Sequence, residues 1–578
     1  MSPYYPNNYQ PQMQCLYKFI ALPSERVKVD FDDFVLQGNP AERCHEDYVD
    51  IYAELQQPEI RLEDAETTIS GRYCGRIAPR TRISLYNIII VGFYSNDNVQ
   101  ERGFNASYHF MKDERYHVGE KAPGTICDQT ITAAAYSEGQ ILSPTYPGAY
   151  PNNLHCTYSL EGNPLQRIQL IFDDFDLYYG GPHCPYDWLK VHDGRSTDAP
   201  LINTMLCGYK HRGKVIFSTK ENLFLEFHSS KAPDSENLGF NIHFKFSSEF
   251  VSLNFLGLPE YHVRGTECDQ RIPSRGISNG TIISPNYPRK YMPGRVCKYL
   301  VDGLNDDQNL EKVNLVFREF NIPRDAYGKC NDGYVAFYLN GDDTEGMPNH
   351  QWCGNYTFHP VISKGPRLLM VLHSGNSSGW GFKAQYSFLT DYGIPGTLCS
   401  QNDVTEGSPQ QCCFTYSGKS QELTGAFVSP RHPHKYPSIT DCIYNFVASP
   451  NQLIRIRFVK FDLASEDPPP GVYPHGTEYC QDDWVEIYQI WSDSPKDREM
   501  RVGRYCKSLT PGPWISEPGV SRLKVLFHSN KDHQAQGFSA VYTFVKGKAK
   551  VADSKTSAQA LTYERETIET IELEIEDF

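Results

Sequence analysis

The sequence predicts an all-β chain that folds as four tandem antiparallel β-sandwiches. A block of motifs occurs four times in fixed order along the 578 residues. Within the blocks, apolar residues recur at every second position, as in Ile-Arg-Ile-Arg-Phe at 454–458, which is typical of a strand with one face in a core and the other in water. Gly, Pro and Asn turns separate these short runs, and helical periodicity is absent before the charged tail.

Composition excludes several classes of function. Hydrophobic residues make up 39% and aromatic residues 13%, which is enough for each block to bury a core of its own. The net charge of −15 opposes attraction to nucleic-acid phosphates and to anionic lipid. The longest apolar stretch, 83–94, is shorter than the about 20 residues that a membrane helix needs. We therefore expect no nucleic-acid binding and no membrane span in this chain.

Seventeen cysteines indicate an oxidising compartment, because none of them forms the Cys-x-x-Cys pairs of a zinc ribbon or a redox site. Oxidising conditions favour an extracellular protein with disulfide bonds, either secreted or at the cell surface. The chain nevertheless opens on a polar, Pro-rich run at 1–14, which is not a secretory signal.

Each block has the same elements in the same order. It opens on Ser-Pro-x-(Tyr/His)-Pro-x-x-Tyr, with a cysteine thirteen residues after the serine. A Phe-x-x-Phe follows, then a cysteine before an acidic-aromatic run, and then Cys-Gly, which is Cys-Lys in the fourth block. An apolar strand ends in Ser, and Gly-Phe opens the last aromatic strand. The opening serines are Ser2, Ser143, Ser284 and Ser429.

These blocks predict four domains and a tail. The domains cover 1–111, 127–246, 268–389 and 413–545. The tail at 546–578 is low in aromatic residues and divides into a basic and an acidic part, so we expect it to be disordered. Its alternating segment at 571–575 is the one part of the tail that could pair with a partner as a strand.

Taken together, the motifs resemble those of the CUB domain, over nearly the whole chain outside the tail. The resemblance implies a jelly-roll-like sandwich that serves as an extracellular protein-recognition module. It also implies bridges from the first to the second and from the third to the fourth cysteine of each domain.

The implied disulfides can be assigned with a spacing of 29 residues between first and second cysteines. They are Cys44/Cys74, Cys127/Cys156, Cys184/Cys207, Cys268/Cys297, Cys330/Cys353, Cys413/Cys442 and Cys480/Cys506. Cys399 and Cys412 then form an extra pair just before the fourth domain, and Cys15 stays unpaired. A partner 29 residues before Cys15 would precede Met1, so we expect the first domain to be truncated at its N-terminus and any secretory signal to have preceded it.

No catalytic constellation is found in the sequence. His45-Glu46 is followed by Asp-Tyr-Val rather than completing His-Glu-x-x-His, and no Gly-x-Ser-x-Gly or Gly-Asp-Ser-Gly offers a serine nucleophile. His-Ser pairs recur at 228–229, 373–374 and 528–529, but neighbours on a strand point to opposite faces. We expect a protein that is not an enzyme, with no catalytic and no cofactor-binding residues.

The resemblance to the CUB domain implies calcium as the candidate metal. Some CUB domains bind it with a Glu soon after Phe-x-x-Phe, an Asp three residues after the third cysteine and an Asp beside the late serine. In this chain the Glu position holds Gln37, Tyr178, Pro323 and Ala464, and the late position holds Asn96, Ser230, Gly375 and Asn530. The middle Asp is kept as Asp47, Asp187 and Asp483, while the third domain has Gly333.

Calcium takes six to eight oxygen ligands and normally several carboxylates. One carboxylate per domain is too few, so we expect no calcium and no other cofactor. The weak remaining metal candidates are Asp47 and Asp97 of the first domain, with Gln37 beside them. The alternative is that these aspartates bond to the backbone at the start of a strand.

Glycosylation sequons occur at Asn105, Asn279, Asn355 and Asn376. Their number is what chance would yield, so position is the better guide. Asn376 lies in the polar turn Ser-Gly-Asn-Ser-Ser-Gly, where an acceptor would be exposed, and is the most favourable of the four.

Binding surfaces are expected in loops that depart from the repeat. The second domain carries Tyr178 and Tyr179 in Tyr-Tyr-Gly-Gly-Pro-His, and the fourth carries an insertion at 467–478 with Tyr473 and His475. Tyr offers a large contact area at low entropic cost, and Pro stiffens a loop. The alternative for both loops is a solvated segment with no partner. The apolar segment 250–258 between domains two and three is expected to pack on a neighbouring domain.

Two classes of function follow from this architecture. Four CUB repeats with an extra cysteine pair before the last are similar to the suppressor of lurcher family, which implies an accessory protein of a cell-surface receptor such as an ionotropic glutamate receptor. The alternative is a secreted adaptor, or the non-catalytic region of a CUB-containing extracellular protease or matrix protein. In both classes the partners are extracellular or cell-surface proteins.

Overall fold

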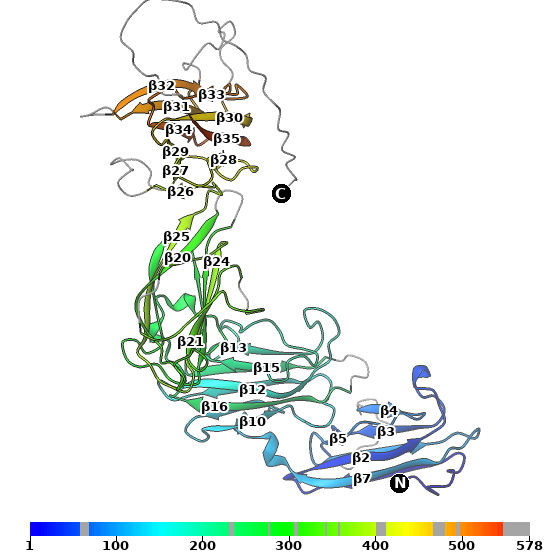
Figure 1. The fold of residues 1–578 in the computed structure, drawn as a ribbon. Helices are drawn as coiled ribbons and strands as arrows, with labels where there is room; N and C mark the ends of the chain where they lie inside the picture. The colour runs from blue at the N-terminus through cyan, green and yellow to red at the C-terminus, as the bar shows by residue number, and fades with distance from the viewer. Residues whose placement is uncertain are drawn as a thin grey trace, which may run out of the picture. The chain divides into compact units, whose positions relative to one another are not determined.

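The structure, a computed structural model, describes residues 1–57, 69–230, 236–274, 278–305, 310–341, 344–355, 359–399, 412–465, 480–492 and 497–546. The all-β class is confirmed, because the helices within these ranges are short 3-10 turns. The chain divides into two compact units, residues 1–304 with 311–389 and residues 305–310 with 390–578. The first unit contains three β-sandwiches and the second contains one (Figure 1).

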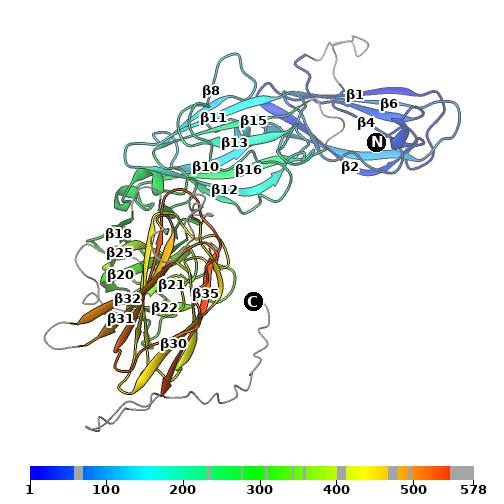
Figure 2. The same ribbon diagram turned by 90° about the horizontal axis from the view of Figure 1, so that it is seen from above.

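The first domain has sheets of order β1-β6-β3-β4 and β5-β2-β7. Its elements are β1 (Gln14–Ile20), β2 (Glu25–Val35), η1 (Pro40–Glu42), β3 (Tyr48–Tyr52), β4 (Gly71–Tyr73), β5 (Arg82–Ile83), β6 (Ile88–Tyr94) and β7 (Gly103–Lys112). Figure 2 shows β1, β6 and β4 in one layer and β2 in the other. The turn η2 (Asp113–Tyr116) leads to the second domain.

The second domain has sheets of order β13-β15-β11-β9-β8 and β10-β16-β12-β14 (Figure 1). Its strands are β8 (Glu120–Lys121), β9 (Gln129–Thr132), β10 (Glu138–Leu142), β11 (His155–Glu161), β12 (Arg167–Asp176), β13 (Trp188–His192), β14 (Val215–Phe217), β15 (Asn222–His228) and β16 (Gly239–Ser247). Two turns follow, η3 (Leu253–Phe255) and η4 (Pro259–Tyr261).

The third domain has sheets of order β17-β19-β24-β21-β22 and β18-β25-β20-β23. Its strands are β17 (Gln270–Pro273), β18 (Asn279–Ile283), β19 (Val296–Asp302), β20 (Glu311–Asn321), β21 (Tyr334–Tyr338), β22 (His350–Trp352), β23 (Val361–Ile362), β24 (Arg367–His373) and β25 (Gly381–Thr390). One apolar core lies between the two sheets, as in the second domain.

The fourth domain has sheets of order β26-β27-β29-β34-β31-β32 and β28-β35-β30-β33. Its strands are β26 (Thr397–Leu398), β27 (Cys413–Ser417), β28 (Thr424–Val428), β29 (Thr440–Val447), β30 (Gln452–Asp462), β31 (Trp484–Trp491), β32 (Arg498–Tyr505), β33 (Trp514–Ile515), β34 (Arg522–Ser529) and β35 (Gly537–Lys546). Because β26 pairs with β27, this sandwich begins earlier in the chain than residue 413.

Domains two, three and four each contain one parallel pair in an otherwise antiparallel sandwich. The pairs are β9 with β11, β17 with β19, and β27 with β29. Each parallel pair therefore skips one strand of the chain, and the skipped strand (β10, β18 or β28) joins the opposite sheet, beside β16, β25 or β35. Alternation of apolar residues does not reveal this crossing, because it indicates which face is buried and not the direction of the neighbouring strand.

A β-bulge explains the Phe-x-x-Phe motif. In a regular strand, residues three apart point to opposite faces. In β12 the register with β16 shifts between Phe172 and Asp174, so one residue is added and both Phe172 and Phe175 point into the core, with 0% and 1% of their surface exposed. The same shift follows Phe31 in β2 and Phe458 in β30.

The opening serine and the late glycine of each block meet in the folded domain. In domain two the backbone N–H of Ser143 donates to Phe240, and the backbone N–H of Phe240 donates to Ser143 Oγ at 3.1 Å. Gly239 has φ +89°, and a Cβ there would lie 1.9 Å from Ser143 Oγ, so no other residue fits. The pairs Ser2/Gly103, Ser284/Gly381 and Ser429/Gly537 repeat this contact.

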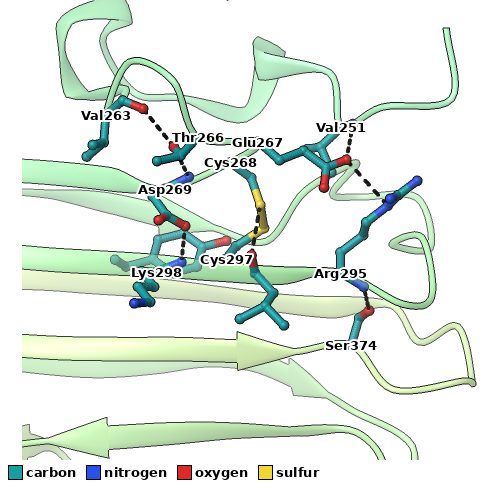
Figure 3. Close-up of a disulfide and its surroundings, with 12 residues drawn as sticks. Val251, Val263, Thr266, Glu267, Cys268, Asp269, Arg295, Cys297, Lys298 and Ser374 are labelled. Carbon is teal, nitrogen blue, oxygen red and sulfur yellow. Dashed lines mark hydrogen bonds and ion pairs between the residues drawn. A yellow bond between two sulfur atoms is a disulfide. The ribbon is translucent and has the colours of Figure 1, made fainter. Parts of the chain in front are cut away.

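Six of the disulfides have the pairing that the resemblance implies. They are Cys44–Cys74, Cys127–Cys156, Cys184–Cys207, Cys268–Cys297, Cys330–Cys353 and Cys480–Cys506. Figure 3 shows Cys268 joined to Cys297, with the Asp269 carboxylate accepting the backbone N–H of Lys298 at 2.8 Å. Cys15 is free and partly exposed.

The two remaining pairs correct the assignment made from spacing. Cys412 bonds to Cys442 and Cys399 bonds to Cys413, rather than Cys399 to Cys412 and Cys413 to Cys442. The parallel register of β27 and β29 places Cys413 opposite Ile443, an offset of 30 residues where the second and third domains have 29. Cys412 therefore faces Cys442. Its neighbour Cys413 points to the other face of the sheet, where Cys399 follows β26.

Buried arginines hold the two junctions within the first unit. Arg167, 5% exposed, donates to the carbonyl oxygens of Val251 and Glu267 at 2.6 Å and of Thr266 at 3.1 Å. Figure 3 shows Glu267 of the linker, whose side chain accepts the N–H of Val251 at 3.1 Å and pairs with Arg295. Phe250, Val251 and Phe255 are buried, which confirms the predicted packing of 250–258.

Arg26 occupies the equivalent position in the first domain. It pairs with Asp113, donates to the carbonyl oxygen of Pro144, and lies 4.0 Å from the ring centre of Tyr116. Tyr116 in turn donates to the carbonyl oxygen of Tyr146 at 2.7 Å. Both linkers are thus part of folded structure rather than free spacers.

Candidate functional site

A buried aspartate organises the loops at one end of the second sandwich. Asp187, three residues after the third cysteine, is 1% exposed. Its carboxylate accepts a 2.6 Å hydrogen bond from the hydroxyl of Tyr150 and a 2.8 Å bond from the backbone N–H of Ser230. The Tyr150 hydroxyl itself accepts the backbone N–H of Tyr178 at 3.0 Å. The network therefore ties three loops together.

The first and fourth domains repeat this network. Tyr9 donates to Asp47 at 2.5 Å, and Tyr436 donates to Asp483 at 2.5 Å. Burial, followed by the hydrogen bond to the carboxylate, raises the pKa of Tyr9 and of Tyr436 well above its ordinary value, so both hydroxyls stay protonated. Burial also raises the pKa of Asp483, against the opposing effect of its hydrogen bonds.

The third domain departs from the pattern because Gly333 stands at the aspartate position. The hydroxyl of Tyr291 is buried with no acceptor for its proton among the described residues. Asp332 instead accepts the backbone N–H of Asn376 at 2.9 Å and its side-chain Nδ2 at 2.8 Å. The loop is held by the neighbouring carboxylate of Asp332, which is partly exposed.

The structure separates the metal candidates of the first domain. Asp47 is fully buried and bonded to Tyr9 and to the backbone of Asn96, whereas Asp97 is exposed. The side chain of Gln37 accepts the backbone N–H of Val99 at 3.1 Å. Within the described part of the chain, no three His, Cys, Asp or Glu side chains are grouped as a metal site.

Four tyrosines gather beside the Asp187 network, and we call them the tyrosine surface: Tyr178, Tyr179, Tyr186 and Tyr209. Tyr178 is partly exposed, and the exposed fractions of the other three are 58%, 45% and 72%. The rings of Tyr178 and Tyr186 lie 5.9 Å apart. Such exposure of several large aromatic side chains in one place is typical of a protein-binding surface.

Covalent and backbone contacts fix the tyrosine surface in place. The Cys184–Cys207 bridge joins the loop after β12 to the segment before β14, and Leu177 and Gly208 exchange two backbone hydrogen bonds. Gly180 has φ +54°, and a Cβ there would lie 2.4 Å from the ring of Tyr186, so the close approach of that ring requires glycine. The surface is therefore largely formed before any partner arrives.

Basic side chains lie along the same edge. Lys210 and Arg212 follow Tyr209 directly and are both exposed. His211 between them packs edge-on against Phe175 at 5.3 Å, and burial lowers the pKa of its imidazole, so it stays neutral at pH 7. The local charge of this segment is positive on a chain whose net charge is −15.

The remaining predicted site residues are those of the fourth-domain insertion and the asparagines of the four sequons. Tyr473 and His475 lie outside the described residues, as do the whole fourth-domain insertion at 467–478 and the tail from residue 547. Asn279, Asn355 and Asn376 are exposed, and Asn105 is partly exposed on β7. Glycosylation of these four sequons stays a prediction.

The His-Ser pairs are structural. His228 stacks on Trp188 with ring centres 5.2 Å apart, and His528 stacks on Trp484 at 5.0 Å. Ser229 is fully buried, where its hydroxyl accepts the backbone N–H of Leu154 and donates to Pro151. The histidine and serine side chains therefore point to opposite faces of the strand, as expected.

Sequence reasoning did not include Tyr186 and Tyr209 in the tyrosine surface. A signal for both was present, because each lies two residues after a cysteine of the bridge expected between Cys184 and Cys207. A bridge brings its flanking residues close together, and Tyr179 is five residues before Cys184. The exposure of each ring depends on the path of the loop, which spacing does not give.

Disulfide-bridged sandwiches in tandem, with rigid loops at their ends, define a class of modular binding protein. Residues 1–108, 127–244, 268–386 and 416–542 match the CUB domain. The chain belongs to the CUB domain family.

Among curated proteins, the chain is 25% identical to cubilin of Rattus norvegicus over 549 residues, which are 94% of this chain and 12% of cubilin. It is 24% identical to tolloid-like protein 1 of Homo sapiens over 591 residues, 96% of this chain and 53% of that protein. The chain thus spans only part of the length of either relative.

Among solved structures, the CUB1-EGF-CUB2 domains of rat MASP-1 are 23% identical, with 45% of this chain and 99% of that chain covered and a TM-score of 0.18. The MASP-1 CUB2 domain bound to Ca2+ is 26% identical, with 22% of this chain and 99% of that chain covered and a TM-score of 0.18.

In the part of the chain that the structure describes, no helix has the length and apolar character needed to span a membrane.

Proposed function

We propose that this chain is an extracellular or cell-surface recognition protein that binds other proteins through the loops of its CUB domains and has no catalytic activity of its own. The observation that carries the proposal is the tyrosine surface of the second domain. Three of its rings are strongly exposed, yet the disulfide and the Asp187 network hold their loops. Exposed and immobilised aromatic rings bind at little cost in conformational entropy.

The charge around this surface indicates the kind of partner. Lys210 and Arg212 stand at its edge, so an acidic protein surface fits better than a basic one. Aromatic rings would supply contact area at the centre, and the two cations would increase the association rate at the rim.

Tandem domains support binding at several points at once. A contact made by one domain raises the effective concentration of the next, so individually weak contacts multiply. The buried linkers within the first unit keep the domain ends at fixed spacing, which favours a partner with matching spacing.

Two biological settings agree with this proposal. One is an accessory protein of a cell-surface receptor, such as an ionotropic glutamate receptor. The other is a secreted adaptor, or the non-catalytic region of a CUB-containing extracellular protease or matrix protein. Both settings require protein binding and neither requires a cofactor.

The experiment that tests the proposal measures binding of the purified chain to a panel of purified extracellular domains, including those of ionotropic glutamate receptors. We expect binding to at least one acidic member, and the double variant Tyr179→Ala, Tyr209→Ala should weaken it by at least about tenfold, as loss of central aromatic contacts does. The matched control is Tyr327→Ala in the third domain, where the tyrosine is 87% exposed. Equal losses for both variants would contradict a role for the tyrosine surface.

A further inference from the structure

The outer face of one sheet in the fourth domain carries a row of three cations. In β30, buried residues alternate with exposed ones, so Arg455 and Arg457 point away from the core. Lys460 follows the bulge and is also exposed. The cations lie opposite every second residue of β35: Arg455 opposite Thr543, Arg457 opposite Val541 and Lys460 opposite Ser539. We call these three side chains the cationic row.

No carboxylate among the described residues pairs with the cationic row. The ion pairs found in this domain involve other side chains: Arg501 and Arg504 with Glu486, Arg522 with Asp497, Lys524 with Glu499, and His528 with Asp441. Asp462 follows the row on β30 and accepts the backbone N–H of Gln536 at 3.4 Å. On a chain with a net charge of −15, neighbouring exposed cations without a counter-charge favour an anionic partner.

The other domains have different residues at these positions. Counted from the first Phe of Phe-x-x-Phe, the positions hold Lys28, Asp30 and Asp33 in the first domain, Gln169, Ile171 and Asp174 in the second, and Asn314, Val316 and Glu319 in the third. The one cation among them, Lys28, pairs with Asp30 at 2.8 Å. The sandwich fold therefore does not require the cationic row.

Short side chains cover the rest of this outer face. The strand order is β28-β35-β30, and all three strands are labelled in Figure 1. The outward residues are Ser539, Val541 and Thr543 on β35, and Thr424, Ala426 and Val428 on β28. The hydroxyl oxygens of Thr424 and Thr543 are 3.4 Å apart, so both strands present these side chains to the same face. The face thus has cations on β30, small residues in the middle and short, largely apolar side chains on β28.

The tail of the same chain carries a complementary pattern. Residues 564–578 include seven acidic residues and one arginine, a net charge of −6. Within this stretch, Glu572, Glu574 and Glu576 alternate with Ile571, Leu573 and Ile575. In an extended segment the two sets point to opposite sides, and the glutamates follow one another at the same two-residue steps as the cationic row.

We propose that residues 571–576 of the tail dock in extended form over β35, with their glutamates toward the cationic row on β30 and their apolar side chains toward β28. Each glutamate then meets one cation, and the isoleucines and the leucine cover Ala426 and Val428. The hydroxyls of Ser539 and Thr543 lie beneath the docked backbone and can bond to its polar groups.

The tail has the length that this contact needs. Lys546, the last residue of β35, pairs with Gln452, three residues before the cationic row begins. Residues 547–570 can span up to about 80 Å, whereas the row is about 15 to 20 Å long. Because the tail is tethered beside the face, its effective concentration there is in the millimolar range. Exposed ion pairs that are individually weak can then hold it.

Other occupants match the face less completely. A sulfated polysaccharide would supply negative charge to the cationic row but would leave the apolar side chains of β28 without a partner. An acidic segment of another protein would lack the tether. The tail of a second copy would have the right pattern and would produce dimers.

The test treats the full chain with a water-soluble carbodiimide, which forms an amide between an amine and a carboxylate in contact. Peptide mapping of the monomer should find the tail glutamates linked to Lys460 at least about fivefold more often than to Lys419 or Lys531, which are exposed lysines of the same domain. Lys419 controls for the tether, because a Cβ on its neighbour Gly418 would lie 3.1 Å from Phe544 near the end of β35.

The double variant Arg455→Gln, Arg457→Gln should lower the yield of links to Lys460 by at least about fivefold. Both arginines are exposed, so the core is unchanged. The matched control is Arg289→Gln with Lys329→Gln, which removes the same charge from exposed positions of the third domain. The control should leave the links to Lys460 unchanged.

A variant of the tail tests the apolar contact separately. Ile571→Ser with Leu573→Ser keeps every glutamate, and it should also lower the yield at Lys460 because burial of the apolar side chains against β28 is lost. Retention of the full yield in this variant would overturn the proposed arrangement.

Equal yields at Lys419 and Lys460, or no effect of the two arginine substitutions, would overturn the proposal, because the tail would then contact the surface without docking. Links found only in covalent dimers would identify the tail of a second copy as the occupant. If links to Lys460 are absent and heparin binds the full chain but not the arginine variant, the cationic row is a polysaccharide site instead.

Discussion

Tyr150 and Asp187 form the centre of a buried hydrogen-bond network in the second domain. The tyrosine hydroxyl donates to the carboxylate and accepts a backbone N–H, so both of its hydrogen-bonding functions are used. The aspartate was predicted from its place three residues after the third cysteine. Its tyrosine partner was visible only as part of the opening motif, because the contact joins residues 37 positions apart.

We expect Tyr150→Phe to destabilise the loops around Asp187 by about 1 to 3 kcal/mol, since it leaves a buried carboxylate oxygen and the N–H of Tyr178 unpaired. Hydrogen exchange of peptides from 178–187 in the full chain measures the loss. The matched control is Tyr291→Phe, which removes a hydroxyl whose proton has no acceptor among the described residues. A larger loss in the control than in Tyr150→Phe would contradict the role of the network.

The same network leads us to expect that calcium has little effect on this chain. Asp47, Asp187 and Asp483 already receive hydrogen bonds from a tyrosine and from backbone N–H groups. The thermal midpoint in the presence of a chelator should therefore equal that in millimolar calcium. Calorimetric binding at about 10 micromolar or tighter in any domain would refute this expectation.

At the scale of the element, the sequence predicted the strands and their inward faces. It did not predict the β-bulges or the parallel strand pairs. Alternating residues such as 454–458 form a strand, β30, as expected. The bulge in β12 is marked by Phe-x-x-Phe, but a three-residue spacing alone does not distinguish a bulge from a loop. Parallel neighbours such as β27 and β29 depend on a chain crossing that leaves no local signal.

The misassigned cysteines of the fourth domain show the limit of spacing. The side chains of the adjacent Cys412 and Cys413 differ only in the face of the sheet to which they point. A shift of one residue in a parallel register exchanges the two faces, and the sequence contains no direct measure of that register. The structure resolves it through the pairing of Cys413 with Ile443.

The linker between domains two and three is expected to respond to acid through His262. Burial lowers the pKa of this imidazole to about 4, helped by Arg167 and Arg264 and opposed by the Thr266 carbonyl and Asp193. The unfolded value is about 6.5, so the linker keeps its full stability above that pH and loses it as the pH falls toward 4. At pH 5 the loss should be about 2 kcal/mol.

Hydrogen exchange of peptides from 247–268 at pH 7 and pH 5 tests this expectation, after correction for the intrinsic pH dependence of exchange. His262→Gln keeps a polar side chain that does not titrate, so its linker should change stability less between the two pH values. An equal pH dependence in the variant and in the unaltered chain would rule out His262 as the acid-sensitive group.

At the scale of the whole molecule, the number and order of domains followed from the repeats, whereas the state of the linkers did not. Residues 250–258 were recognisable as apolar, but the partner that fixes them is Arg167, which lies far away in the sequence. From the sequence alone, an isolated arginine at the start of a strand is interpreted as a solvent-exposed charge. Only the folded chain brings the linker carbonyls around it.

Arg167→Ala should release the linker, because it removes the side-chain donor from the carbonyl oxygens of Val251, Glu267 and Ser218 in a buried site and leaves the Thr266 carbonyl with its bond to His262 alone. We expect a destabilisation of about 3 to 5 kcal/mol at this junction. Limited proteolysis should then cut the full chain first between 247 and 268. Arg76→Ala, at an exposed position in the first domain, is the control and should leave the cleavage pattern unchanged.

The acceptors around Arg26 and Arg167 include backbone carbonyls of the linker and of the adjoining domain. A carbonyl is present whatever side chain the residue carries. Substitutions can therefore accumulate along a linker without removing the bonds that fix it, provided that its path is kept. A duplicated domain would keep the arginine that binds its linker carbonyls. Arrays of such domains can therefore lengthen while the side chains of their linkers change.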